Sequence, residues 1–212
     1  MSRTVVIVVV VAICLGIYFL VDNIKNAYKL MPVQENPTMQ VAPFADWREF
    51  TSDAEGFQVS LPAYPQHATQ NVFIPNTNKR RKYDMYAAEK VNGSVFMISV
   101  ITYPDDVKFP PNINILENAV QEMMDINPNN QLEKMEHSRF LNHDAVDFSI
   151  KNPDFQISGK AIQQGKAVYL LTYVAKIADV VPTEYQHFLD TFRFIDKTVP
   201  AAVPPPEPQA KR

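Results

Sequence analysis

The sequence predicts an α+β domain, in which a mostly antiparallel β-sheet is flanked by two helices and preceded by an N-terminal transmembrane helix. Three observations predict this arrangement: an unbroken apolar run near the start, many short segments with β-type patterns, and two segments with apolar residues at helical spacing. Helices that pack on an antiparallel sheet define the α+β class. About 190 residues follow the apolar run, enough for one domain with its own core.

The apolar run from Val5 to Val21 has the length of a membrane-spanning helix. At about 1.5 Å per residue it reaches about 25 Å, and the long side chains of Arg3 and Lys25 extend its reach toward a hydrocarbon core of about 30 Å. The helix is expected to continue past the membrane interface up to Met31. We therefore assign residues 1–31 to a membrane anchor that contacts lipid through this helix.

Two alternatives to an uncleaved anchor are a cleaved signal peptide and a lipid-modified cysteine. A signal peptide has small residues at positions minus three and minus one, and the segment after Val21 lacks this pair. Cys14 follows Ile13, where a lipoprotein signal has a small residue, and apolar residues continue after it to Leu20. Both alternatives fit the residues less well than an anchor does.

The very short segment before the run and the large domain after it favour a single-pass protein with a cytoplasmic N-terminus. The domain is then extracytoplasmic, which in a bacterial-type envelope is periplasmic. The positive-inside rule alone is nearly balanced, because Arg3 and the amino terminus oppose Lys25 and Lys29. Cys14 is the only cysteine, so the domain can form no internal disulfide in any compartment.

Proline-containing polar segments bound the domain on both sides. Residues 32–43 form a linker with three prolines, and residues 197–212 form a Pro-rich tail that we expect to be disordered. Residues 44–196 carry 14 Lys and Arg against 20 Asp and Glu, a net charge of −6. This acidic balance argues against nucleic acid as a partner.

Short β segments account for most of the domain. Residues 95–101 are apolar on both faces, which predicts an interior strand of a sheet, and Asn92 and Gly93 before them are typical of a hairpin turn. The last four strands have the spacing of an antiparallel meander. The expected strands are 47–51, 57–61, 70–74, 82–90, 95–103, 132–140, 143–150, 155–163 and 167–175.

Helical spacing of apolar residues predicts one helix between these strands and one at the end of the domain. Asn114 is a suitable N-cap for the first, with Glu117 three residues later. Thr183–Gln186 has the pattern of a capping box and is expected to begin the second. The expected buried residues are Leu116, Ala119, Val120, Met123 and Met124 in the first helix and Tyr185, Phe188, Leu189 and Phe192 in the second.

Segments at both ends of the domain carry a resemblance to a known fold group. They are Trp47 with Phe50, Gly56–Pro62 and Phe188–Phe194. Through them the chain from about residue 47 to 195 resembles the PsbP-like fold group, shared by the photosystem II extrinsic subunit and small bacterial envelope proteins, including DcrB-like ones. The resemblance implies an antiparallel sheet flanked by helices, and assembly or binding roles in membrane compartments. It carries over no active-site residue.

The sequence lacks the motifs of enzyme chemistry. With only five glycines there is no phosphate-cradling loop, dinucleotide fingerprint or nucleophile elbow, and no paired-histidine zinc motif occurs. The sequence therefore predicts no catalytic residue, no cofactor and no enzyme activity.

The nearest approach to a site is a group of imidazole and carboxylate side chains around one hairpin turn. The candidate metal ligands are His137, His143 and Asp144, with Glu136 and Asp147 nearby. Metal binding needs the two arms of the hairpin to bring these groups together. An envelope enzyme, or a metal- or solute-binding domain, is the alternative function that such a cluster would support. The interpretation that we favour places them at a solvated turn.

Lys79, Arg80, Arg81 and Lys82 form the only run of like charges. On an acidic domain this basic run is a candidate contact for phosphate, anionic lipid headgroups or an acidic partner. The other interpretation is a solvated beginning of a strand.

These residues predict a non-catalytic, membrane-anchored accessory or assembly protein of a bacterial-type envelope. The anchor and linker would hold the domain at high effective concentration near a membrane-protein or envelope-protein partner, so that a weak interface is sufficient. The basic run and the Pro-rich tail are its candidate contacts.

Overall fold

The computed structural model describes residues 44–74, 77–109 and 114–196. The expected membrane anchor, the linker and the Pro-rich tail lie outside these residues. Within the described part of the chain, no helix combines the length and the apolar composition needed to cross a membrane.

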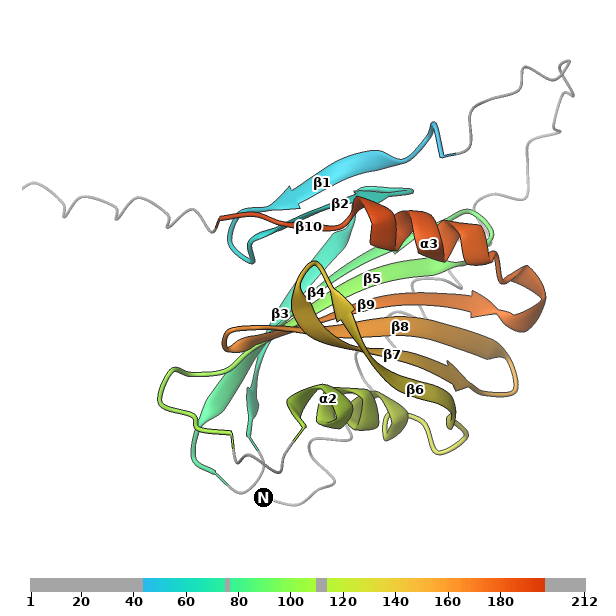
Figure 1. Ribbon diagram of the computed structural model, residues 1–212. Helices are drawn as coiled ribbons and strands as arrows, with labels where there is room; N and C mark the ends of the chain where they lie inside the picture. Colours follow the sequence, from blue (N-terminus) through green and yellow to red (C-terminus); the bar gives the residue numbers. More distant parts are fainter. Residues whose placement is uncertain (1–43, 75–76, 110–113, 197–212) are drawn as a thin grey trace, which may run out of the picture.

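The largest element is a seven-stranded sheet in which every pair of neighbours is antiparallel (Figure 1). The expected meander and the hairpin around Gly93 are confirmed, and the φ of 84° at Gly93 is one that glycine adopts readily. The third strand begins at Gln66 rather than at Gln70. From edge to edge the strands are β3 (Gln66–Phe73), β4 (Arg80–Glu89), β5 (Val95–Thr102), β9 (Ala167–Lys176), β8 (Phe155–Gln164), β7 (His143–Lys151) and β6 (Gln131–Phe140).

The remaining strands form a second sheet, where the sequence pattern suggested a single one. Its order is β1 (Arg48–Ser52), β2 (Phe57–Leu61) and β10 (Arg193–Phe194). The alternating apolar residues of β2 are fully buried because this strand lays its face on the large sheet instead of pairing with its edge. In Figure 1 the small sheet lies above the large one, together with the last helix.

Two helices cover opposite faces of the large sheet (Figure 1). α2 (Ile115–Met124) packs on β7, β8 and β9. The side-chain oxygen of Asn114 accepts hydrogen bonds from the backbone N–H groups of Leu116 and Glu117, at 3.0 and 3.3 Å. The predicted N-cap is therefore confirmed.

α3 (Pro182–Thr191) begins without a capping box, so the prediction of one is wrong. Pro182 occupies the first turn, where its missing N–H would have no partner within the helix. Glu184 is buried and forms an ion pair with Lys90, so its carboxylate is directed to the β4–β5 turn. A short 3-10 helix, η1 (Ile177–Asp179), precedes α3.

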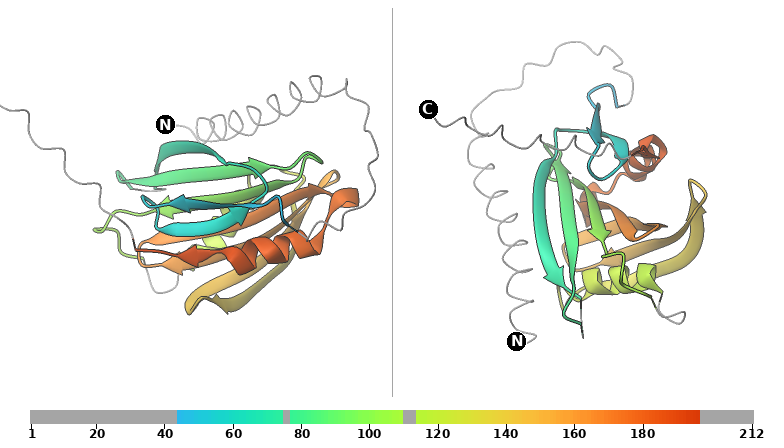
Figure 2. Two further views of the ribbon diagram at one scale, coloured as in Figure 1. Left: turned by 90° about the horizontal axis from the view of Figure 1, so that it is seen from above. Right: turned by 90° about the vertical axis from the view of Figure 1, so that its left-hand side faces the viewer.

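The sheet separates two hydrophobic clusters, and the views in Figure 2 show the layers that enclose them. Alternation along β9 places Tyr169 in the cluster under α3 and the small sheet, and Leu170 in the cluster under α2. Gly159 allows close packing on the α2 face, because a Cβ atom there would lie 2.1 Å from Cζ of Phe148. β5 is an interior strand, as its apolar sequence predicted.

Candidate functional site

The basic run enters the fold at the start of β4, where the pleat of the strand separates its members. Arg81 lies on the α2 face and is 6% exposed. Its guanidinium donates hydrogen bonds to the Tyr103 hydroxyl at 2.8 Å and to the Glu122 carboxylate at 2.7 Å. Burial lowers the pKa of Arg81, but Glu122 and Tyr103 raise it to a net value above the ordinary one. Arg81 thus fastens α2 to the large sheet.

Lys82 lies on the opposite face, toward the small sheet. Its ammonium is 2.7 Å from a carboxylate oxygen of Glu55 and 2.9 Å from one of Asp84. These two residues are only 3% and 1% exposed. Burial lowers the pKa of Lys82, but the hydrogen bonds to both carboxylates raise it to about 12. One cation therefore contacts two buried acids, one in the β1–β2 turn and one on β4.

The other two cations of the run have contacts at the surface. Lys79 forms an ion pair of 2.7 Å with Asp106, and the Arg80 guanidinium lies 4.3 Å from the centre of the Phe73 ring. The structure does not bring the four basic side chains together as one patch, because each has a different partner. Their role as a partner contact stays a prediction.

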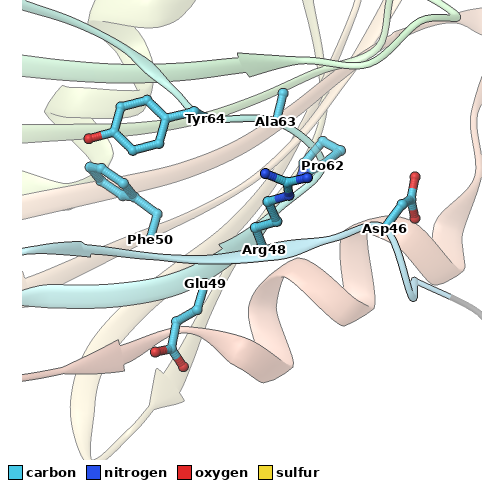
Figure 3. Close-up of a pocket in the computed structure, with 7 residues that line it drawn as sticks. All are labelled: Asp46, Arg48, Glu49, Phe50, Pro62, Ala63 and Tyr64. Carbon is cyan, nitrogen blue, oxygen red and sulfur yellow. The ribbon is translucent and has the colours of Figure 1, made fainter.

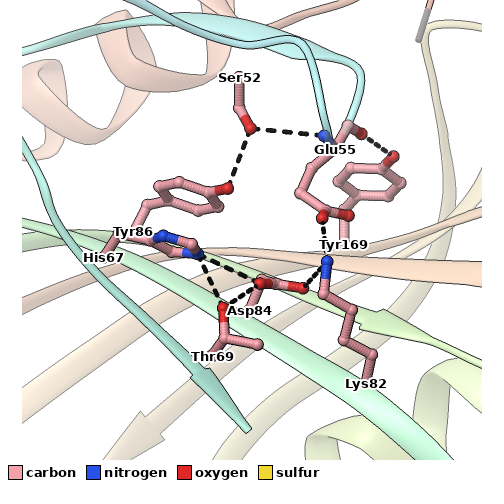
Figure 4. Close-up of polar contacts among 8 residues, drawn as sticks. All are labelled: Ser52, Glu55, His67, Thr69, Lys82, Asp84, Tyr86 and Tyr169. Atoms are coloured by element: carbon pink, nitrogen blue, oxygen red, sulfur yellow. Dashed lines mark hydrogen bonds and ion pairs between the residues drawn. The ribbon is translucent and has the colours of Figure 1, made fainter. Parts of the chain in front are cut away.

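The buried acids belong to a polar network that fastens the β1–β2 turn to the large sheet (Figure 4). Asp84 accepts a hydrogen bond of 2.6 Å from the Thr69 hydroxyl and lies 3.1 Å from Nε2 of His67. Burial raises the pKa of Asp84, but hydrogen bonds from Thr69, Lys82 and His67 hold it below its ordinary value. Asp84 is therefore ionised and held by donors from two strands.

Two tyrosines complete this attachment of the turn. The Tyr169 hydroxyl donates a hydrogen bond of 2.6 Å to the backbone carbonyl of Glu55, and the Tyr86 and Ser52 hydroxyls are 3.0 Å apart. Burial raises the pKa of both tyrosines, so both hydroxyls are neutral at physiological pH. The network joins the two sheets through hydrogen bonds and ion pairs among its own members.

The hairpin of β6 and β7 does not bring the candidate metal ligands together. The register places His137 opposite Val146 and Phe140 opposite His143, so the two histidines lie on opposite faces of the sheet. Nε2 of His137 is 2.8 Å from Glu117 of α2, whereas the His143 ring packs on Phe194. In the described residues, no three acidic, histidine or cysteine side chains are arranged to hold a metal ion.

The acidic candidates beside them are also separated. Asp144 lies opposite Arg139 in the register, on the face of His137. Asp147 and Glu136 lie on the other face, where Asp147 forms an ion pair with Lys160 of β8. The alternative function as an enzyme or metal-binding domain depended on a convergence of these groups that is not found here.

A shallow pocket of about 260 Å³ opens on the small sheet, at the end of β1 where the chain enters the domain (Figure 3). Tyr64, 84% exposed, and the partly buried Phe50 form an edge-to-face pair with ring centres 5.5 Å apart. Arg48 projects beside them, and Asp46 lies at the end of the pocket. The remaining lining residues are Glu49, Pro62 and Ala63.

Sequence reasoning missed both the polar network and the pocket. Lys82, Asp84 and Tyr86 occupy alternate positions of one strand, and this period of two was the available signal that they share a face. Glu55 and Tyr169, which complete the network, come from distant segments, and no local pattern connects them with this strand. Arg48 and Tyr64 likewise meet only through the pairing of β1 with β2.

The fold and these contacts define an α+β domain of two antiparallel sheets and two helices, whose polar residues hold its layers together and whose open pocket carries aromatic and charged groups. The chain is similar in structure to the cyanobacterial PsbP protein of Synechocystis, with a TM-score of 0.48 and 9% identity over 74% of this chain and 98% of that one. It is also similar to PA94, a protein of unknown function from Pseudomonas aeruginosa, with a TM-score of 0.34 and 16% identity over 66% and 90% of the two chains.

The resemblance to the PsbP-like fold group is thus found by comparison of structures as well as in the sequence. At these identities and TM-scores, the similarity assigns no residue role and no activity to this chain. No protein-family profile matches the chain, and no curated protein matches it.

Proposed function

We propose that this chain is a membrane-tethered, non-catalytic binding protein that acts as an accessory or assembly factor in a bacterial-type envelope, with its domain on the periplasmic side. The observation that carries this proposal is the open pocket of Tyr64, Phe50 and Arg48. Tyrosine, phenylalanine and arginine are enriched where proteins contact each other, because they offer large contact areas together with polar groups. A shallow aromatic and charged surface suits contact with another protein.

The position of the pocket fits a tethered mechanism. Asp46 and Arg48 lie close to residue 44, where the described chain begins, and the proposed anchor and linker precede that point. A tether attached beside the contact surface would keep that surface near membrane partners and raise their effective concentration. The structure gives Arg81 and Lys82 partners inside the domain, so we place the main contact at the pocket and not at the basic run.

The test is crosslinking of the full-length protein in native membranes, followed by affinity purification. Replacing Arg48 and Tyr64 together with alanine should lower recovery of the crosslinked membrane partner about tenfold or more, the effect of losing a few central contact residues. The matched control replaces another exposed cation and apolar residue, Lys151 and Ile177, with alanine and should recover as much as the wild type. Equal recovery of the partner by both double variants would show that the pocket is not the contact surface.

A further inference from the structure

The two edges of the seven-stranded sheet differ in how they are protected against pairing. β3 is one edge, and no described strand pairs with its outer side. Its eight residues include no lysine, arginine, aspartate, glutamate or proline. An edge strand presents a row of unpaired N–H and C=O groups, which proteins usually guard with charges, prolines or bulges. β3 has none of these guards.

β6, the opposite edge, is guarded in the expected way. It carries both lysine and arginine side chains, at Lys134 and Arg139, and two glutamates, Glu133 and Glu136. A register shift between Leu132 and Lys134 marks a bulge in its pairing with β7. The contrast within one sheet indicates that β3 is kept open for pairing.

The side chains of β3 fall into two sets that are fixed by its pairing with β4. Thr69 and Phe73 share one face with His67, and Ala68 and Val72 share the other with Gln70. Two copies that extend the sheet through this edge would be related by a twofold axis perpendicular to it, which keeps each face on its own side. Residues that meet must then come from the same face.

A pairing centred on Gln70 satisfies this condition along the whole strand. Gln70 then lies opposite Gln70 of the second copy, where two amides can hydrogen-bond. The half-exposed rings of His67 and Phe73 meet across the edge, and such aromatic pairs stabilise antiparallel strands. The same register places Ala68 opposite Val72 and Thr69 opposite Asn71. It places no like charges opposite each other.

We propose that two copies of this chain dimerise by antiparallel pairing of their β3 strands, in the register that places Gln70 opposite itself. The strand is complementary to itself and has no charge that would select an acidic or basic peptide, and this favours a second copy as the occupant. The dimer would form one sheet through both domains. The pairing of β3 is inferred without the pocket or its residues, so this inference does not depend on the proposed function.

The first test uses charge at the central position of the full-length protein in detergent micelles, with mass measured by sedimentation. The wild type should be a dimer. Gln70→Lys and Gln70→Glu should each weaken the dimer by about fivefold or more, because like charges then face each other, and an equimolar mixture of the two should restore it. The matched controls Gln131→Lys and Gln131→Glu on β6 should leave the dimer unchanged. A monomeric wild type, or Gln70 variants that dimerise as the controls do, would overturn the proposal.

The second test fixes the register and distinguishes this contact from association through the anchor. In a Cys14→Ser background, a mixture of Ala68→Cys and Val72→Cys chains should form a disulfide-linked dimer on mild oxidation. Either variant alone should not, because its two cysteines would lie about 14 Å apart, beyond the reach of a disulfide. Equal crosslinking by one variant alone would contradict the register.

Discussion

Arg81 and Lys82 are neighbours in sequence, yet they stabilise opposite faces of the same sheet. Arg81 is the more deeply buried cation, and its acidic partner Glu122 is 41% exposed. Lys82 is partly exposed, but its two partners, Glu55 and Asp84, are buried. When a cation is removed, the cost depends on what happens to the charge left behind. We therefore expect burial of the partner, and not of the cation itself, to decide which substitution costs more stability.

The largest effect is expected for Lys82→Met, which removes the ammonium that contacts two buried carboxylates, those of Glu55 and Asp84. The free energy of unfolding should fall by about 3 kcal/mol, the lower end for breaking a buried ion pair, because Lys82 itself reaches solvent. Urea unfolding of the full-length protein in micelles, followed by fluorescence of Trp47, would measure it, since Trp47 is the only tryptophan and is buried in the core under the small sheet. A loss smaller than that of Arg81→Met would contradict the comparison.

The same variant should acquire a dependence of stability on pH that the wild type lacks between pH 5 and pH 8. In the wild type the pKa of Asp84 is below that of the unfolded chain, so its contribution is present above about pH 4 and is lost as the pH falls through the folded value. The pKa of Lys82 is raised, so its contribution is full below about pH 10 and is lost as the pH rises through about 12. These two groups should therefore change the stability of the wild type little between pH 5 and pH 8.

Without Lys82, burial should raise the pKa of Asp84 above its unfolded value, because one of the donors that offset burial is lost. Lys82→Met should then be more stable at pH 5 than at pH 8, as measured by urea midpoints at the two values. A variant that keeps the profile of the wild type would show that Lys82 does not set the charge state of Asp84.

A smaller loss is expected for Arg81→Met, on the α2 face. The variant loses hydrogen bonds to Tyr103 and Glu122, but the Glu122 carboxylate can turn to solvent, so the cost should be about 1–2 kcal/mol. Arg80→Met is the matched control, because Arg80 is exposed and its guanidinium lies over the ring of Phe73. The control should remain within about 0.5 kcal/mol of the wild type.

Tyr169→Phe should cost about 1 kcal/mol, because one hydrogen bond to the carbonyl of Glu55 is lost while the ring stays in the core. Tyr64→Phe, which removes a hydroxyl from an exposed ring, should leave the unfolding midpoint unchanged. If the two substitutions had the same effect, the bond from Tyr169 would not hold the turn.

The smallest effect is expected at the surface pair. Lys79→Gln breaks the contact with Asp106, and exposed pairs of this kind contribute little and are screened by salt. The unfolding midpoint should match that of the wild type at high ionic strength. A clear loss of stability there would mean that Lys79 has a structural role like that of Lys82.

Much of the fold could be predicted from periodicity alone. The strands from 131 to 176 and α2 were within reach because each is long, strongly patterned and bounded by its own turn or N-cap. The small sheet was not, since the pairing of Phe194 with Phe57 joins residues far apart in the chain. Thr183 and Glu184 match a capping box by letter, but burial of Glu184 against Lys90 overrides that local pattern.

The sites were less accessible to sequence reasoning for the same reason. Four consecutive cations suggest one basic patch as long as their secondary structure is not considered. In β4, the pleat of the strand places the side chains of Arg81 and Lys82 on opposite faces of the sheet. His137 and His143 are likewise close in sequence and separated by the sheet. Tyr64 lies in a loop whose position depends on β2, and nothing in its neighbourhood marks it as a contact residue.

Hydrogen exchange on Lys82→Met and Arg81→Met, measured side by side by mass spectrometry, tests whether one basic run fastens two different layers. We expect faster exchange at the β1–β2 turn, residues 52–56, in Lys82→Met only, and faster exchange along α2 in Arg81→Met only. Equal acceleration of both segments in both variants, or no local change in either, would contradict it.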